Sequence, residues 1–521
     1  MRKLIGAAAL ALFLLTFSTL PLLAQETPKK LTLIEKETVL GKLAENKDTR
    51  ALSISTDYNH LAVLSQKGEK YLVTMDGAPG REYDWIVARS LTFSSDGKRS
   101  AYVVQQGDTM FAVVDGKDGK PYREIASSNI VFSPAGPRYA YYARPKAGGK
   151  WIVVIDGEES KEFDQVGNLS FSPDGKRVAF GVETGGKQFF VIDNAVGGEK
   201  EYDKVAGSSF TWSADGKHYA YGAVRDSKVL IIADGKEGKP YKESGRPMFS
   251  PDGQHLLYVG IPEDNKARVV LDEKEQKEYR RIISESIRFS PDSKRLAYIA
   301  TRTDPKDKDK QEMFYVIDGE ETQPYEALKV DGFIFSPDSK RISFQCVKNK
   351  NKTIVVIDGI EGKEYDDVRL AQFSPDSKKM AYIALRDRRV YAVIDNAEGR
   401  GYEGIANLLF SSDGKQMAYV VARGKKQCVV LNGIEAKNDY DGIVPDNLAF
   451  SPDGKHIAYE ARRENKPFFV VDETESKEHA GSMRGSRVAW DSPTSFHALV
   501  LKGEKDKDKD VVRLQVDLVG G

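Results

Sequence analysis

Side chains that could act as acids, bases or nucleophiles are spread along this chain instead of being gathered in one segment. The chain has six histidines, and four of them occupy one slot of an internal repeat that holds arginine, lysine or glutamine in other copies. These four are His60, His218, His255 and His456. His479 and His497 lie elsewhere, and neither has an evident serine or cysteine nucleophile for a triad. The histidines therefore predict no catalytic cluster.

An aspartate recurs more regularly still, in phrases such as FSPDGKRVAF at 171–180 and FSPDGKHIAY at 450–459. In this phrase Pro173 presets φ for the second position of a type I turn, Asp174 suits the third, and Gly175 accepts the left-handed conformation that follows. A catalytic carboxylate is not copied ten times, so we interpret the aspartate as a turn residue. Its ten copies are Asp57, Asp96, Asp174, Asp215, Asp252, Asp292, Asp338, Asp376, Asp413 and Asp453.

Other signatures of chemistry are missing from the sequence. The chain has no G-x-S-x-G nucleophile elbow, and its paired glycines do not launch a helix as a phosphate-binding loop would. We interpret the charged stretches at 301–312 and 502–510 as solvated hairpin tips. In the run KDKDKD the carboxylates alternate with lysines and lack the glycine and terminal glutamate of an EF-hand loop. Cys346 and Cys428 lie in apolar segments and are expected to pack in strands. We therefore predict no catalytic, metal-binding or cofactor-binding residues and assign no ligand-binding residues.

The turn phrase marks a repeat with a period of about 40 residues, the length of a four-stranded propeller blade. Four short segments rich in β-branched and aromatic residues, NLSFS, KRVAFGV, KQFFVID and KEYDKV, follow one another within residues 168–205. The twelve copies align on Ser55, Ser94, Ser133, Ser172, Ser213, Ser250, Ser290, Ser336, Ser374, Ser411 and Ser451, with Asp491 in the same slot. We therefore predict an all-β fold of twelve four-stranded blades.

A second phrase, such as VIDGIEGKEY, closes the third strand with Asp-Gly and opens the fourth with an aromatic residue. An aromatic at one fixed place near the outer edge of a blade is expected to cover the apolar gap between blades, and ligand stacking is the alternative. The residues concerned are Tyr83, Tyr122, Phe163, Tyr202, Tyr241, Tyr279, Tyr325, Tyr365, Tyr402 and Tyr440.

Together the two phrases resemble the WD40-like repeats of TolB-type β-propellers over about residues 50–521. The resemblance implies rings of antiparallel blades and favours two tandem six-bladed propellers, 51–285 and 286–521. A seven-plus-five division and one wide ring are the alternatives. The last repeat stops after its third strand, so the segment 25–50 is a candidate for the missing outer strand, and that closure would move the boundary.

The N-terminus predicts export. Arg2 and Lys3 precede a long apolar run that ends near Ala24, as in a secretory signal peptide covering residues 1–24, and an uncleaved anchor is the alternative. We expect a periplasmic or extracellular protein with no integral membrane span after cleavage. The 78 basic and 78 acidic residues balance, so no global field attracts nucleic acid.

These observations favour a non-enzymatic, TolB-like scaffold of the cell envelope that binds a protein or peptide partner at a ring face. Proteins resembling TolB itself carry a small α/β domain that has no room here, which puts a Tol–Pal role in doubt. One alternative is a carbohydrate-binding or enzymatic propeller with its site at a channel mouth, and another is a structural spacer. The residues that break the repeat, and would mark such a site, are Trp85, Trp151 and 479–487.

Overall fold

The computed structural model describes residues 31–43, 49–126, 130–193, 200–349, 351–503 and 509–520. The expected signal peptide, 1–24, lies outside these residues. Within them the chain is built of strands and one short 3₁₀ helix, η1 (Ala88–Ser90). No helix in these ranges is long and apolar enough to cross a membrane.

The strands form twelve antiparallel sheets that follow the twelve sequence repeats, which confirms the predicted blades. Blades 1–4 contain β2 (Thr49–Ile54), β3 (Leu61–Lys67), β4 (Lys70–Met75) and β5 (Ala78–Pro79); β6 (Trp85–Ile86), β7 (Thr92–Phe93), β8 (Ser100–Gln106), β9 (Thr109–Val114) and β10 (Lys117–Asp118); β11 (Glu124–Ile125), β12 (Val131–Phe132), β13 (Tyr139–Arg144), β14 (Ile152–Ile155) and β15 (Glu158–Glu159); and β16 (Gln165–Phe171), β17 (Val178–Thr184) and β18 (Lys187–Ile192).

Blades 5–8 continue the pattern, and in blades 6 and 8 the inner strand is split into two short pieces. Their strands are β19 (Lys204–Trp212), β20 (Tyr219–Arg225), β21 (Lys228–Ala233) and β22 (Lys236–Glu237); β23 (Glu243–Ser244), β24 (Met248–Phe249), β25 (Leu256–Ile261), β26 (Ala267–Leu271) and β27 (Lys274–Tyr279); β28 (Arg281–Phe289), β29 (Leu296–Thr303), β30 (Gln311–Ile317) and β31 (Glu320–Glu321); and β32 (Ala327–Leu328), β33 (Ile334–Phe335), β34 (Ile342–Lys348), β35 (Lys352–Ile357) and β36 (Ile360–Tyr365).

Blades 9–12 complete the chain, and blade 12 takes its outer strand from the N-terminus. Their strands are β37 (Asp367–Phe373), β38 (Met380–Arg386), β39 (Arg389–Ile394) and β40 (Ala397–Tyr402); β41 (Gly404–Phe410), β42 (Met417–Arg423), β43 (Lys426–Leu431) and β44 (Ile434–Glu435); β45 (Gly442–Phe450), β46 (Ile457–Arg463), β47 (Lys466–Val471) and β48 (Thr474–Glu475); and β49 (Gly481–Ser482), β50 (Ala489–Ser492), β51 (Ser495–Lys502), β52 (Lys509–Val519) and β1 (Thr32–Leu43).

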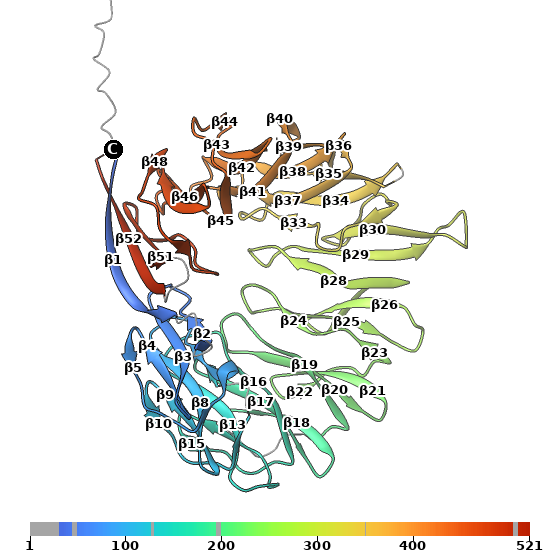
Figure 1. Ribbon diagram of the computed structural model, residues 1–521. Coiled ribbons are helices and arrows are strands. Elements are labelled where there is room, and N and C mark those ends of the chain that lie inside the picture. Colours follow the sequence, from blue (N-terminus) through green and yellow to red (C-terminus); the bar gives the residue numbers. More distant parts are fainter. Residues whose placement is uncertain are drawn as a thin grey trace, which may run out of the picture.

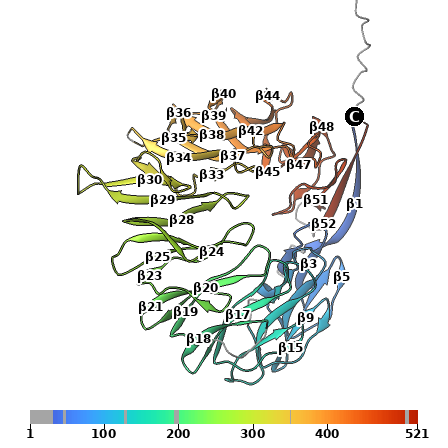
Figure 2. The same ribbon diagram turned by 180° about the vertical axis from the view of Figure 1, so that it is seen from behind.

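The twelve blades stand in one ring, with the first strand of each blade toward the centre and the last at the rim (Figure 1). The view from behind shows the same succession (Figure 2). Twelve apolar clusters form the core, one between each pair of neighbouring blades, including blades 6 and 7 and blades 12 and 1. The expected division into two six-bladed rings is therefore corrected to a single twelve-bladed ring, because blade 6 buries its face against blade 7 like any other pair.

Ring closure joins the two ends of the chain. Strand β1 pairs antiparallel with β52, from Thr32 opposite Val519 to Leu43 opposite Lys509, with one irregularity between Val39 and Gly41. A second tie is the apolar cluster that brings Leu40 of β1 to Leu61 of blade 1 and Leu499 of blade 12. Closure of this kind covers the sheet faces that the first and last blades would otherwise expose.

The central strands of the blades are buried on both faces, which explains their nearly continuous apolar sequences. In β38, MAYIALR, the first five residues are all buried. Each blade is covered by a neighbour on both sides, so the alternation of apolar and polar residues that marks a one-sided sheet is lost. The ring is thus a chain of equivalent sheet-on-sheet contacts.

The repeated turn has the predicted geometry. The amide of Gly175 donates to the carbonyl of Ser172 at 2.8 Å, and Gly175 has a φ of +72°. The Ser172 hydroxyl donates to Asp174 at 2.6 Å and accepts from the Arg177 amide at 3.0 Å. The repeated aspartate therefore fixes a turn, as its copy number predicts.

Candidate functional site

The repeated polar residues are occupied in holding blades together. Arg177 donates to Asp193, directly after β18 of its own blade, at 2.8 Å, and to the carbonyl of Lys217 in the next blade at 2.7 Å. Histidines in the same slot make the first of these contacts, as when His218 meets Asp234 at 2.7 Å. The arginines and histidines at this repeat position therefore have a structural role, as their recurrence in the sequence predicts.

The repeated tyrosines also join neighbouring blades. Tyr122 and Tyr402 are almost fully buried, and their hydroxyls donate to Glu159 and Glu435 on the outer strand of the next blade, each at 2.9 Å. Burial and the nearby carboxylates raise the pKa of both tyrosines far above the usual value. Packing between blades is thereby confirmed as their role, since a buried ring that holds a carboxylate has no face left for a ligand.

Both cysteines are buried and unpaired in strands, as predicted. Burial raises the pKa of Cys346 to about 12 and that of Cys428 to about 11. A thiol with so high a pKa is a poor nucleophile at neutral pH.

The residues that break the repeat are not brought together. Trp85, at the start of blade 2, is 48% exposed and packs edge-on against Tyr71 of blade 1. Trp151 lies in blade 3, where the Arg144 guanidinium stands 4.1 Å from its ring. The segment 479–487 begins at the junction of blades 11 and 12, where burial lowers the pKa of His479 to about 4. They mark three separate places, so no joint site forms among them.

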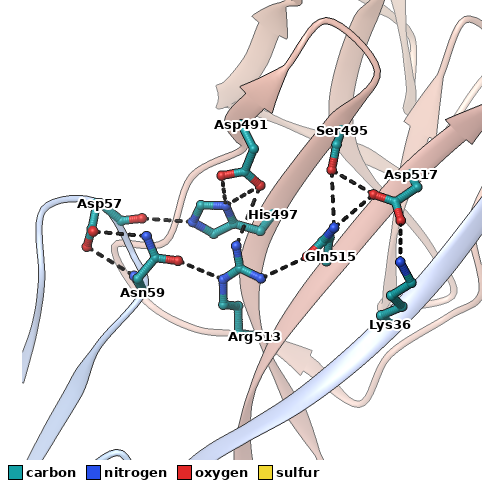
Figure 3. Close-up of polar contacts among 9 residues, drawn as sticks. All are labelled: Lys36, Asp57, Asn59, Asp491, Ser495, His497, Arg513, Gln515 and Asp517. Atoms are coloured by element: carbon teal, nitrogen blue, oxygen red, sulfur yellow. Dashed lines mark hydrogen bonds and ion pairs between the residues drawn. The ribbon is translucent and has the colours of Figure 1, made fainter.

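A network of polar side chains fills the closing seam between blades 12 and 1 (Figure 3). His497 is buried, with Nδ1 2.9 Å from the Asp491 carboxylate and Nε2 2.8 Å from the carbonyl oxygen of Asp57 in blade 1. Arg513 donates to Asn59 of blade 1 at 2.8 Å. Blade 12 lacks the repeated turn, and these contacts connect its strands β51 and β52 to blade 1.

The seam contains serine, histidine and aspartate without forming a triad. The Ser495 hydroxyl donates to Asp517 at 2.7 Å, and Lys36 of β1 holds the same carboxylate at 2.8 Å. Because His497 Nε2 is bonded to a backbone carbonyl, that nitrogen is not available to take a proton from a serine. The polar side chains of the seam therefore stabilise the closure of the ring between blades 12 and 1.

Another irregularity lies four residues before each turn serine, and four residues before Asp491 in blade 12. We call this position the bulge slot, because the pairing of the first two strands is interrupted there in blades 4, 9 and 10. Small or polar residues fill it in most blades, whereas blade 9 has leucine. In chain order the slot holds Ala51, Ser90, Asn129, Asn168, Ser209, Arg246, Ser286, Gly332, Leu370, Asn407, Asn447 and Arg487.

Leu370 differs from asparagines in the bulge slot in its backbone strain, and from Asn407 in its lack of a hydrogen bond to the next blade. Its φ is +51°, a left-handed conformation that asparagine tolerates and leucine adopts at a cost. Asn168 and Asn407 have nearly the same φ, 55° and 53°, and the Asn407 amide donates to the Pro445 carbonyl of the next blade at 2.7 Å. Leu370 has no polar atom for such a tie, and it is 52% exposed.

Leu370 stands at an apolar pocket between blades 9 and 10, beside their inner strands β37 and β41. The pocket has a volume of about 460 Å³ and is lined by Leu370, Asp367, Arg369, Ile383, Leu385, Val390, Gly404 and Ile405. At its rim Arg369 donates to the Asp367 carboxylate at 2.6 Å, and Lys329 of blade 8 forms an ion pair with the same carboxylate at 3.4 Å. We refer to this cavity as the blade 9–10 pocket. An apolar hollow with a few polar groups at the rim is the usual form of a binding site.

The same place between blades 4 and 5 shows what the repeat does without the leucine. There a cavity of about 160 Å³ is lined by Asn168, Glu183 and Gln188 among others. The Gln188 amide donates to Glu183 at 2.9 Å and its oxygen accepts from the Val205 amide of blade 5 at 3.0 Å. Leu385 and Val390 hold the positions of Glu183 and Gln188 in blade 9, and they cannot close the space with hydrogen bonds.

The sequence analysis assigns no ligand-binding residues. Leu370 gives no signal by itself, because a leucine in a strand is ordinary. Comparing the twelve bulge slots would have singled it out. Among the described residues no group of three or more histidine, cysteine, aspartate or glutamate side chains is placed to hold a metal ion.

No protein-family model and no curated protein matches the chain. Among solved structures, a eukaryotic initiation factor is similar at 12% identity over 66% of this chain and 96% of its own, with a TM-score of 0.33. TolB from Acinetobacter baumannii is similar at 17% identity over 52% and 79%, with a TM-score of 0.22. The β-propeller domain of the Trilobed protease from Pyrococcus furiosus is similar at 14% identity over 60% and 96%, with a TM-score of 0.25. At TM-scores this low the likenesses carry no argument, and the assignment of the fold as a β-propeller rests on the twelve blades themselves.

Proposed function

We propose that the protein is an exported, non-enzymatic β-propeller that binds a protein or peptide partner, and that the partner inserts an apolar side chain into the blade 9–10 pocket. The observation that carries the proposal is Leu370, a half-exposed leucine held in a left-handed conformation at the pocket. Strained backbone and exposed apolar surface both lower stability, and proteins keep such features mainly where they bind something.

The pocket suits a side chain more than a small polar substrate. Its walls are aliphatic, from Ile383, Leu385, Val390 and Ile405, and the charged groups lie at the rim. Burying a large apolar side chain contributes about 1.5–3 kcal/mol, which is enough to anchor a peptide segment. The Arg369 side chain is 76% exposed and can donate to the backbone of such a segment.

A selection of random peptides displayed on phage tests this proposal. We expect the purified protein to enrich peptides that share one bulky apolar residue, and their affinity to fall when that residue is changed to alanine. The matched control is the variant Leu370→Asn, which restores the residue of the equivalent slots in blades 4 and 10. Enriched peptides that bind the control equally well, or no enrichment at all, would contradict the proposal.

A further inference from the structure

The rim of the blade 9–10 pocket holds two cations and one carboxylate. Arg369 Nε donates to Oδ2 of Asp367 at 2.6 Å, and Lys329 Nζ, from blade 8, donates to its Oδ1 at 3.4 Å. In the part of the chain that the structure describes, neither cation contacts a second carboxylate. One positive charge is therefore left without a partner at the rim, where it attracts an anion.

The Arg369 guanidinium is only partly engaged. Its Nε bonds Asp367, but within the described ranges no group accepts a hydrogen bond from Nη1 or Nη2, and the side chain is 76% exposed. The terminal nitrogens of arginine form a planar fork that fits the two oxygens of a carboxylate. Arg369 can thus bind a carboxylate that arrives from solvent without giving up Asp367.

The closed junction between blades 4 and 5 lacks these charged groups, although it has the same bulge. Counted from the turn serines, the residues in the places of the two cations and the carboxylate there are Ala126, Gly167 and Gln165. The bulge therefore does not require the charges. They accompany the apolar pocket, so we assign them to the recognition of its occupant.

The short distance between the pocket and Arg369 restricts which carboxylate fits. Leu370, which lines the pocket, directly follows Arg369, and neighbouring Cα atoms are about 3.8 Å apart. In an extended peptide the side chain beside the inserted one points to the opposite face, so an acidic neighbour would turn away from the rim. A C-terminal residue instead carries its carboxylate on the same Cα as its side chain. Its side chain and its carboxylate therefore match the apolar wall and the arginine.

We propose that the blade 9–10 pocket binds the free C-terminus of a chain that ends in a bulky apolar residue. The terminal side chain enters the pocket, and the terminal carboxylate accepts hydrogen bonds from Nη1 and Nη2 of Arg369, with Lys329 adding to the attraction. Hydrogen bonds between ionised groups are about twice as strong as neutral ones, which favours a terminus over an internal peptide carbonyl. This role rests on the proposed function, and adds to it that the partner's chain ends at the pocket.

Peptides that differ only at the C-terminus test this specificity. From a random library displayed with a free C-terminus, we expect the native protein to enrich peptides whose last residue is bulky and apolar. The best of them is then made as the free acid, as the C-terminal amide, and with Glu-Gly added after the apolar residue, and isothermal titration calorimetry gives each affinity. We expect the amide and the extended peptide to bind at least about tenfold more weakly than the free acid.

The variant Arg369→Gln separates the carboxylate contact from the apolar contact. It should lower the affinity of the free acid about tenfold, to that of the amide, and leave the affinity of the amide unchanged. Leu370→Asn should weaken both peptides, because both insert the same side chain. Arg484→Gln, at an exposed arginine of blade 12, is the matched control and should weaken neither.

The outcomes distinguish this role from the proposed function. An amide or an extended peptide that binds as tightly as the free acid would overturn C-terminal recognition while the apolar anchor stands. The same holds if Arg369→Gln weakens the free acid and the amide alike, since a merely structural arginine would act on both. A library from which no peptide is enriched would overturn the anchor and the C-terminal role together.

Discussion

The blade 9–10 pocket and the cavity between blades 4 and 5 occupy the same place in the repeat, and their difference shows how a scaffold position becomes a site. Between blades 4 and 5, Asn168 accepts the left-handed bulge and the pair Glu183 and Gln188 closes the space with hydrogen bonds. In blade 9 the equivalent residues are Leu370, Leu385 and Val390, and the cavity is nearly three times as large. The bulge has the same register and nearly the same φ at both junctions. The difference therefore lies in the lining side chains, which besides these three positions include Ile383 where blade 4 has Gly181.

The largest effect is expected from converting the open pocket into the closed one. The double substitution Leu385→Glu and Val390→Gln introduces the hydrogen-bonded pair of blade 4 into blade 9. Affinity for a peptide selected on the native protein should fall about 100-fold, because the apolar surface that receives the side chain is replaced by polar groups. Isothermal titration calorimetry measures the change. An unchanged affinity would place the peptide elsewhere on the ring.

The reverse substitution, Asn168→Leu, tests whether the bulge itself disfavours leucine. We expect the free energy of unfolding to fall by about 1–2 kcal/mol, since leucine pays for the left-handed conformation that asparagine adopts readily. Denaturant titration followed by circular dichroism measures this loss. The variant should gain no peptide binding at blades 4 and 5, because Glu183 and Gln188 still fill the cavity. A variant as stable as the native protein would show that the left-handed bulge does not disfavour leucine.

Leu370→Asn should separate stability from binding. We expect peptide affinity to fall about fivefold to tenfold from the loss of apolar contact, while the free energy of unfolding rises by about 0.5–1 kcal/mol as the strain is relieved. A fall in peptide affinity together with a rise in the free energy of unfolding would show that Leu370 serves binding at a cost in stability. A loss of both affinity and stability would mean that Leu370 is an ordinary packing residue.

The smallest effect concerns the rim, where blade 9 has Asp367 and blade 4 has Gln165. Burial works to raise the pKa of Asp367, but the hydrogen bond from Arg369 and the charge of Lys329 outweigh it, so the pKa lies below its ordinary value of 3.8. The stabilisation is present above pH 3.8 and is lost as the pH falls through the lowered pKa. Asp367→Gln should therefore cost under about 0.5 kcal/mol at neutral pH, and the cost should shrink as the pH falls below 3.8. A difference that grows toward low pH would contradict this assignment.

The local features of the fold could be predicted because each depends on a few neighbouring residues. The turn at Ser172–Gly175 follows from its proline and glycine, and the buried Tyr122 follows from an aromatic residue at a fixed edge position. The number of blades in the ring could not be predicted. It depends on the angle between neighbouring blades, and many side-chain contacts together determine that angle. A comparison of the twelve bulge slots would have marked Leu370 as the exception, but its left-handed conformation could not be predicted, because φ at the bulge is set by how the two strands pair.

The pairing of β1 with β52 also decides how the ring responds to force. Thr32, at the N-terminal end of β1, lies opposite Val519, at the C-terminal end of β52. Tension applied between the two termini therefore loads the first hydrogen bonds of the pair and breaks them one after another, as in peeling, whereas a sheared strand pair would share the load over all its bonds. We therefore expect tension to open the ring at this seam first, before the remaining blades unfold.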